Sequence, residues 1–166
     1  MMRQSGFGAI AAIVVLVILA VLSAAIVSIG TTQQTGSAQD IMSARAWQAA
    51  RAGNEWGLYQ ALRPTGTWTE GAASDLCPAA GALGHGTPVS QPLDLTADTG
   101  FHVTVTGDCW RYNEGETIPG TARAVRIYRI RAVACPLATC PATGADLAAV
   151  AGVGYVERTR VVLATD

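Results

Sequence analysis

The longest run of hydrophobic positions lies near the start of the chain. Residues 7–30 read FGAIAAIVVLVILAVLSAAIVSIG and include no charged side chain. These 24 residues exceed the roughly 20 that a helix needs to cross the hydrocarbon core of a bilayer, and Val, Ile, Leu and Ala are side chains that hydrocarbon accepts. The pattern predicts a membrane-embedded helix over residues 7–30, which we call the stem.

A polar stretch follows the stem. Residues 31–43 read TTQQTGSAQDIMS, and Gly30 and Gly36 each weaken a helix by roughly 1 kcal/mol relative to Ala. Helical periodicity returns from Asp40 to Leu62, because apolar or small residues recur there at three- and four-residue steps: Met42, Ala46, Ala49, Gly53, Trp56 and Tyr59. Arg63-Pro64 ends the pattern, since a residue before proline avoids helical geometry. We expect residues 31–63 to continue the stem helix into a globular head.

One face of this second helix carries aromatic and small residues. Trp56 and Tyr59 require burial, so we expect them to pack on the rest of the head. Gly53 and Gly57 lie four residues apart and would let a neighbouring strand or helix come close. The helix is therefore predicted to be the spine of the head.

Periodicity disappears over residues 64–100. This region is rich in Gly, Pro, Ala, Ser and Thr, which predicts a long connecting loop, pinned by Cys77. Alternation of apolar and polar residues then marks a strand over Phe101–Trp110, with Phe101, Val103 and Val105 on one face.

Two further strands are expected. Ala124–Cys135 places Tyr128, Ile130, Ala132 and Ala134 on one face and Val125 and Ile127 on the other, which indicates a bulge or a two-sided strand. Residues 155–164 form the last strand, and polar runs over 111–121 and 136–154 read as loops. The pattern predicts an α+β fold, in which a long N-terminal helix packs on a small antiparallel sheet built from residues 101–166.

Charge gives the expected orientation in a membrane. The chain has 166 residues, a formal charge of −1 and only Arg as its basic residue, so nothing indicates a nucleic-acid partner. Arg3 precedes the stem, and the next charged residues are Asp40 and Arg45. Because short basic flanks stay in the cytoplasm, we expect an inner-membrane protein with its N-terminus in the cytoplasm and its head in the periplasm.

The four cysteines favour disulfides over zinc. Cys77, Cys109, Cys135 and Cys140 follow an apolar segment that places them in an oxidising compartment, and no histidine lies at ligand spacing. Three pairings are possible. Since Cys109 and Cys135 both end their strands, the preferred pairing joins them and leaves Cys77 with Cys140; a local Cys135–Cys140 bridge is the close competitor.

Catalytic patterns are absent from the sequence. His85 lies in a Gly-rich loop and His102 on the polar face of a strand, and neither has a partner at a spacing that indicates a metal or a general base. No phosphate loop, nucleophile elbow or carboxylate pair is present. We therefore expect neither an enzyme nor a cofactor.

Two charged groups have surface interpretations. Glu114 and Glu116 fit a solvated hairpin tip. Arg126, Arg129 and Arg131 lie on one strand and could form a basic stripe for an anionic partner, although strand arginines are usually just solvated.

The stem admits three interpretations. A cleavable export signal would use Ser23-Ala24-Ala25 as its exit, but the apolar run continues past it. A plain membrane anchor is the second. The third comes from the residues ahead of the stem: the hydrophilic MMRQSG ends in Gly6 and is followed at once by Phe7. This junction resembles the class III leader of type IV pilins and pseudopilins. The resemblance implies cleavage after Gly6 by a prepilin peptidase and methylation of Phe7.

One residue departs from the family pattern. Pilins usually carry Glu at the fifth mature position, where this chain has Ala11. In the family that carboxylate meets the terminal amine of a neighbouring subunit inside the apolar filament core, where an unpaired charge is costly. Its absence favours a minor subunit at the filament tip, above which nothing docks.

Further resemblance lies in the spine and the strands. The run AARAGNEWGLYQAL at 49–62 resembles a segment of MshP-type minor pilins of mannose-sensitive haemagglutinin (MSHA) pilus biogenesis. The runs VTVTGDC, YRIRAVAC and YVERTR resemble the C-terminal half of the same proteins, and residues 64–100 show no likeness. The resemblance implies a type IV pilin-like fold.

The sequence thus favours a structural role. We expect a minor pilin or pseudopilin that primes or tips an MSHA-like type IV pilus, with other pilin subunits, the prepilin peptidase and the inner membrane as partners, and with the pilus or cell surface as its final location. Small residues at Ala20, Ala24 and Ser28, every fourth position, would serve side-by-side packing of stems. The alternative is a disulfide-bonded binding domain, secreted or anchored by a single pass.

Overall fold

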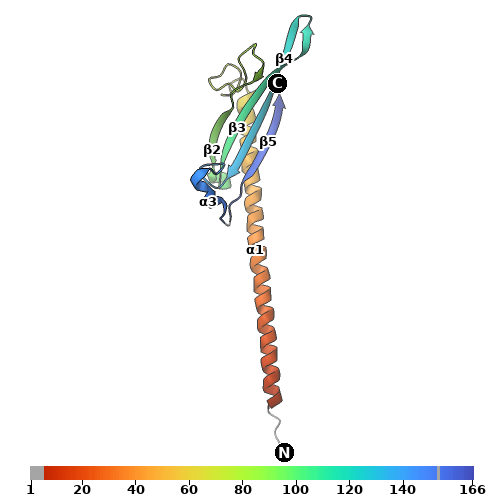
Figure 1. Cartoon of the computed structure of the whole chain (residues 1–166), viewed down its shortest axis with the longest axis vertical. Helices are drawn as coiled ribbons and strands as arrows, with labels where there is room; N and C mark the ends of the chain where they lie inside the picture. Colours follow the sequence, from red (N-terminus) through yellow and green to blue (C-terminus); the bar gives the residue numbers. More distant parts are fainter. Residues whose placement is uncertain (1–5, 153) are drawn as a thin grey trace, which may run out of the picture. The chain divides into compact units, whose positions relative to one another are not determined.

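A long helix and an antiparallel sheet make up the computed structural model, which describes residues 6–152 and 154–166, without the side chains of residues 7, 28–33, 35, 145 and 147. In chain order the elements are α1 (Gly6–Leu62), β1 (Gly84–His85), β2 (Val89–Leu95), α2 (Thr96–Thr99), β3 (Phe101–Ile118), β4 (Thr121–Cys135), a 3-10 turn η1 (Gly144–Asp146), α3 (Leu147–Val150) and β5 (Arg158–Thr165) (Figure 1). The expected α+β class is confirmed, as is the long N-terminal helix.

The chain divides into two compact units, Met1–Ile41 and Met42–Asp166. The first holds the stem, and the second, which we call the head, holds the remainder of α1 and all the strands. Neither Gly30 nor Gly36 interrupts α1. A Cβ added at Gly36 would meet nothing within 4 Å, so this glycine weakens the helix through propensity alone.

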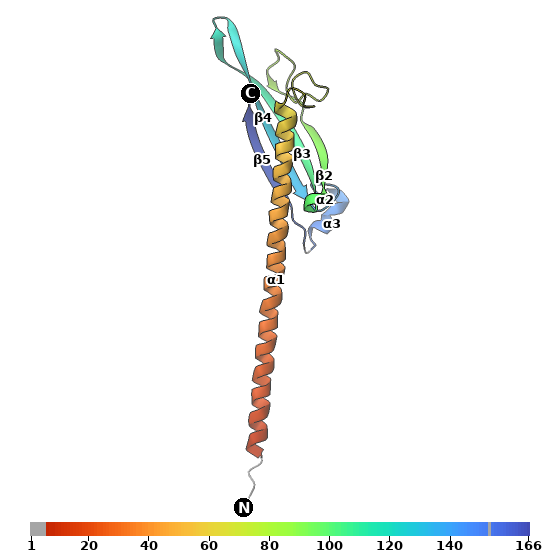
Figure 2. The ribbon, with the colours of Figure 1, turned by 180° about the vertical axis from the view of Figure 1, so that it is seen from behind.

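Every strand pair of the head is antiparallel. The sheet has the order β1-β3-β4-β5, and β2 pairs with β3 along the same edge as β1. Figures 1 and 2 show residues 42–62 of α1 covering one face of this sheet and β5 at one side of it. The α1 portion of the head and the sheet therefore form two layers.

The prediction of an unbroken loop over 64–100 is wrong for its last third. Residues 84–85 and 89–95 are strands, and Leu93 pairs with Val103 on β3. Pro92 lies inside β2, a position that argues against a central strand. The sheet tolerates it because, among the residues that the structure describes, β2 pairs only with β3 and its other side is an edge.

The expected loop over 111–121 is also wrong. Strands β3 and β4 continue to a tight turn at Pro119-Gly120, and Gly120 adopts φ +84°, which other residues rarely do. The register shifts twice, between Asn113 and Ile118. β1 ends opposite Arg111 and β5 ends opposite Ile127, so 112–124 is a two-stranded projection, which we call the arm.

Small residues of α1 face the sheet. Ala46, Ala49, Ala50 and Ala61 are at most 2 % exposed. A Cβ on Gly53 would lie 2.7 Å from Val103 Cγ1, and one on Gly57 would lie 2.5 Å from Ile130 Cγ2. The predicted close approach at both glycines is confirmed, and the partners are strands β3 and β4. The faces predicted for these strands are confirmed too, since Phe101, Val103, Val105, Tyr128, Ile130, Ala132 and Ala134 are all buried.

The two predicted aromatic contacts have different outcomes. Trp56 packs against the core and meets Trp68 edge to face at 5.2 Å between ring centroids. Tyr59 is 50 % exposed and lies under the Arg63 guanidinium instead, so its predicted packing on the sheet is wrong. The reason is angular: three residues after Trp56 a side chain lies about 60° from Trp56 around the helix axis, on the side away from Gly53 and Gly57.

A smaller cluster lies on the opposite face of the sheet. Val133, Cys135 and Cys140 are buried there, with Leu137 and Tyr155 packed against them. Leu137 and Tyr155, which lie before η1 and after α3 in the chain, therefore cover that end of β4. The two-sided interpretation of β4 fits this arrangement, since Tyr128, Ile130 and Ala132 face α1.

The disulfides join Cys77 to Cys109 and Cys135 to Cys140, with Cα–Cα distances of 4.8 and 5.7 Å. The preferred pairing of Cys109 with Cys135, and with it Cys77 with Cys140, is wrong. In an antiparallel pair the carboxyl ends of the two strands lie at opposite ends. Accordingly Cys109 lies opposite Tyr128, while Cys135 lies opposite His102, seven residues away along β3.

Candidate functional site

The stem exposes a large apolar surface. Residues Gly8–Val27 form a helix long and apolar enough to cross a membrane, judged by length and composition. Its large side chains are 51–70 % exposed: Ile10, Ile13, Val14, Val15, Leu16, Val17, Ile18, Leu19, Val21, Leu22, Ile26 and Val27. Removing these side chains from water would contribute on the order of 20 kcal/mol of favourable free energy. Such a helix fits a single-pass membrane anchor or an export signal.

The Ser23 hydroxyl in the stem has a local hydrogen-bond partner. The Ser23 hydroxyl donates to the Leu19 carbonyl oxygen at 2.8 Å, one turn earlier. This bond matters in hydrocarbon, where an unpaired hydroxyl is costly. Ser23 is therefore compatible with an apolar environment.

The predicted stem residues all lie on α1. Gly6 is its first residue, and Ala11, Ala20 and Ala24 are exposed on it. The side chains of Phe7 and Ser28 lie outside the described set, as do residues 1–5 of the expected leader. The processing and packing roles of these residues stay predictions.

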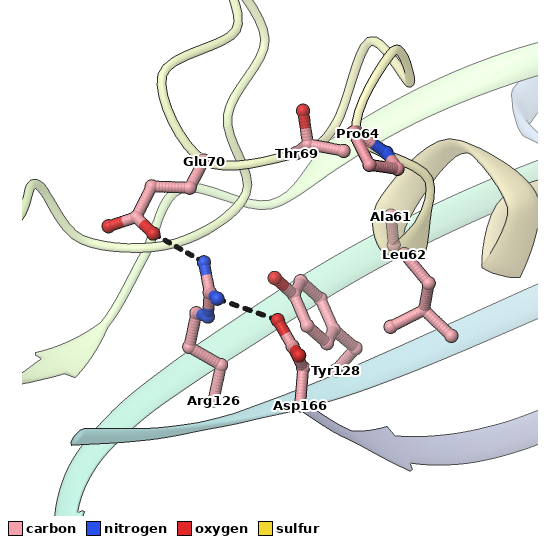
Figure 3. Close-up of a pocket in the computed structure, with 8 residues that line it drawn as sticks. All are labelled: Ala61, Leu62, Pro64, Thr69, Glu70, Arg126, Tyr128 and Asp166. Carbon is pink, nitrogen blue, oxygen red and sulfur yellow. Dashed lines mark hydrogen bonds and ion pairs between the residues drawn. The ribbon is translucent and has the colours of Figure 1, made fainter. Parts of the chain in front are cut away.

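A charged cavity lies at the end of α1. It encloses about 360 Å³ and is lined by Ala61, Leu62, Pro64, Thr69, Glu70, Arg126, Tyr128 and Asp166. Figure 3 shows Arg126 between two carboxylates, with Nη1 2.5 Å from Glu70 and Nη2 2.6 Å from Asp166. Arg111, which is 6 % exposed, also binds Glu70 through Nη2. Two cations thus meet two anions, and the site is neutral.

The pKa values here reflect structural pairing. The Arg111 hydrogen bond lowers the pKa of Glu70, and the charge of Arg126 lowers it further, against an opposing effect of burial. Burial raises the pKa of Tyr128. Both shifts favour the protonation states that Glu70 and Tyr128 usually have at neutral pH, so neither of these two groups is poised for proton transfer.

The basic stripe expected on β4 is not free. Arg126 pairs with Glu70 and Asp166 on the α1 side of the sheet. On the other side Arg129 donates to Asp108 from Nη2 at 2.6 Å and lies 4.9 Å from the Trp110 ring centroid. Arg131 alone of the three is exposed with no ion pair among the described residues. A continuous stripe for an anion is therefore wrong.

The histidines acquire carboxylate neighbours that sequence spacing did not reveal. His85 stacks on Trp110 at 4.8 Å, and its Nε2 lies 3.5 Å from Asp108 Oδ1. His102 Nδ1 lies 3.7 Å from Asp94 Oδ1. Bonds from the Thr96 hydroxyl and amide lower the pKa of Asp94. Both carboxylates are already engaged, Asp108 by Arg129 and Asp94 by Thr96.

The arm keeps its acidic residues in solvent. Glu114 and Glu116 are exposed, and Glu116 Oε2 accepts a bond from the Gly120 amide at 2.9 Å across the turn. Within residues 6–152 and 154–166, no three His, Cys, Asp or Glu side chains gather as metal ligands would. The described chemistry of the head is that of pairing and packing.

Sequence reasoning missed Glu70, Asp166 and Asn54. The first two lie far from Arg126 in the chain, and only the fold brings them together. Asn54 is 3 % exposed on α1, and a polar residue beside Gly53 in a small-residue face was the available signal.

In comparisons with known proteins, no protein-family model, curated protein or solved structure matches this sequence.

Proposed function

We propose that this chain is a minor pilin or pseudopilin, a subunit that primes or tips a type IV, MSHA-like filament. One observation carries the proposal: Gly6-Phe7 stands where the apolar helix begins, and the same helix continues to Leu62 as the layer that packs on the sheet. A segment that must leave lipid for a filament needs an apolar helix attached to a folded head.

The stem supports an assembly role through its chemistry. It is uncharged from Phe7 to Gly30, so it can pass from lipid into a core of similar helices at little electrostatic cost. Ala20 and Ala24 are small and exposed, and small residues at four-residue spacing allow helices to approach closely.

Ala11 supports a minor role. A carboxylate at this position would draw the terminal amine of a neighbouring subunit inside the filament core. Without it, the subunit lacks that docking contact and suits the tip or the priming complex better than the shaft.

The mature N-terminus tests the proposal. The chain is expressed in its native host, or with a prepilin peptidase, and the purified protein is read by mass spectrometry. We expect N-methylated Phe7 as the first residue, and Gly6→Ala as the matched control should leave the leader uncut.

Other N-termini would contradict the proposal in recognisable ways. A start near Ile26 would indicate an export signal and a secreted domain. An intact Met1 in the presence of active peptidase would indicate a plain single-pass anchor. Co-purification with pilus components supports the assignment only together with the processed Phe7.

A further inference from the structure

Strand β5 has an open edge. The Arg126 and Asp166 main chains exchange two hydrogen bonds, of 3.2 and 3.1 Å. Because hydrogen-bonded pairs alternate along an antiparallel ladder, the main chains of Arg160, Val162 and Ala164 also point to β4. Those of Thr159, Val161, Leu163 and Thr165 therefore point away from it, and no described strand pairs with them.

This edge lacks several of the usual protections against pairing. Natural edges carry Pro, bulges, charged side chains, inward charges or very short strands. β5 has eight residues, no Pro or Gly and an unbroken register with β4, and its charged residues are Arg158 and Arg160. Val161 and Leu163 are 52 % and 66 % exposed. The edge is regular, and it suits an added strand whose charge is opposite to that of the two arginines.

A cavity lies beside this edge, between α1 and β5. It encloses about 230 Å³ and is lined by Arg51, Asn54, Glu55, Leu58, Arg160 and Val162. Asn54 is 3 % exposed, and neither its Oδ1 nor its Nδ2 has a hydrogen-bond partner among the described residues. Arg160 Nη1 is likewise buried and unpaired, while its guanidinium lies 4.6 Å from the Trp47 ring centroid.

Unpaired donors at this depth favour a ligand with acceptors. Leaving a buried polar group without a partner costs stability, so a molecule that supplies the partner gains affinity. Arg160 Nη1 and Asn54 Nδ2 are both donors, and a carboxylate accepts from both.

The charges around the edge agree with an acidic ligand. Arg158 begins β5 and its side chain donates to Ser43 Oγ, and the exposed Arg131 lies opposite Val161 on β4. At the cavity rim Arg51 is paired with Glu55 at 2.8 Å. Arginines therefore outnumber carboxylates here.

We propose that the β5 edge binds an extended acidic segment of another protein chain. The segment adds a strand to the sheet and places one Asp or Glu carboxylate beside Asn54 and Arg160. This docking surface does not depend on the filament role, so either proposal can fail alone.

A library of random ten-residue peptides displayed on phage serves as the probe. It is selected against the full chain in detergent micelles, with empty micelles as the background. We expect enriched peptides that alternate β-branched residues and carry an acidic residue. In hydrogen exchange, a synthetic enriched peptide should newly protect the amides of Val161 and Leu163, whereas those of Val162 and Ala164 are protected beforehand.

Two variants separate docking from folding. Val161→Pro removes an outward amide and should weaken the peptide at least about ten-fold, while Ser90→Pro, two residues from Pro92 on the β2 edge, is the matched control and should not. Asn54→Leu should weaken the peptide without lowering the melting temperature, since it removes two unpaired buried atoms. Replacing the peptide's acid by its amide should then cost less affinity for Asn54→Leu than for the unaltered chain, because only the Arg160 contact is left to lose.

Three results would overturn the proposal. The first is no enrichment above empty micelles. The second is a peptide that binds Val161→Pro as tightly as it binds the unaltered chain. The third is protection of Val161 and Leu163 in the free protein through self-association, which would make the occupant a second copy of this chain.

Discussion

At the scale of single residues, Gly57 shows how closely α1 and the sheet pack. An added Cβ would lie 2.5 Å from Ile130 Cγ2 and 3.0 Å from Val105 Cγ1, both side chains in a filled core. Although Ala favours helix over Gly by roughly 1 kcal/mol, overpacking costs roughly 1–3 kcal/mol. We expect Gly57→Ala to lower the free energy of unfolding, measured by urea with tryptophan fluorescence, since all four tryptophans lie in the head.

Gly36→Ala is the control for Gly57→Ala. It makes the same chemical change on the same helix at a position with nothing within 4 Å. We expect it to leave head unfolding unchanged and to raise helicity slightly in circular dichroism. Equal stability of Gly57→Ala and the unaltered chain would show that the helix does not pack this closely on the sheet.

Glu70 provides a pH-dependent prediction. Its folded pKa is lowered, chiefly by Arg111, so the ionised form stabilises the head above the ordinary pKa of Glu. That stability is lost as pH falls through the lowered folded pKa. Glu70→Gln should therefore reduce the melting temperature at pH 7, by an effect on the order of 1 kcal/mol or less because Glu70 is 40 % exposed.

In acid, the melting temperature of Glu70→Gln should approach that of the unaltered chain. As pH falls through the lowered folded pKa of Glu70, the native carboxylate becomes protonated and the difference in melting temperature should shrink. Glu114→Gln, on the solvated arm, is the control and should show no such dependence. A constant difference from pH 7 to pH 3 would contradict the role of the charge.

At the scale of elements, the two disulfides should stabilise the head to different extents. Cys77–Cys109 closes a loop of sequence separation 32 and fixes the segment after α1 to β3, whereas Cys135–Cys140 spans only 5. Chain entropy gives roughly 3–4 kcal/mol for the first and about 2 kcal/mol for the second. We expect the double Cys→Ala variant at 77 and 109 to unfold at lower urea concentration than the one at 135 and 140.

Peptide mapping checks the pairing independently. Proteolysis without reduction should release Cys77 linked to Cys109, and a peptide linking Cys109 to Cys135 would contradict the described strand register. If both double variants unfold at the urea concentration of the unaltered chain, the bridges do not stabilise the head.

The local sequence pattern predicted correctly those elements that have the same neighbour along their length. Alternation of apolar and polar residues predicted the buried faces of β3 and β4 because α1 covers one side of both strands along their shared length. It failed at β2, where only the edge position permits Pro92, and in the arm, where polar residues such as Glu114 extend a hairpin that nothing covers. Edge position and hairpin length depend on neighbouring strands, and a local window contains no information on them.

The candidate sites follow the same rule. The apolar stem was visible because its chemistry lies in one continuous segment. The Glu70–Arg126–Asp166 group and the β5 edge were not, because each joins residues 40 or more positions apart. Tyr59 shows a related failure: aromatic residues dominate a hydrophobic pattern, while the glycines and alanines that contact the sheet contribute little to it.

At the scale of the whole chain, one helix is long and apolar enough to cross a membrane. Val17 lies in the middle of Gly8–Val27, and Arg at the centre of a membrane helix costs roughly 2.5–3.5 kcal/mol. We expect Val17→Arg to reduce the carbonate-resistant membrane fraction in cells, with Val17→Leu as the control. If Val17→Arg stays in the membrane as fully as Val17→Leu, this helix is not the membrane segment.

The glycine contacts between helix and sheet have a last consequence for how recognition by the head can diversify. Where Gly53 and Gly57 meet the strands, the two layers leave no room for a guest molecule, and the two cavities described above lie at the end of α1 and beside β5. Any binding surface of the head would therefore lie at the rim, along the free strand and the projecting hairpin. Substitutions there can change what is recognised while the interior stays as it is, so new binding preferences can arise without endangering the fold.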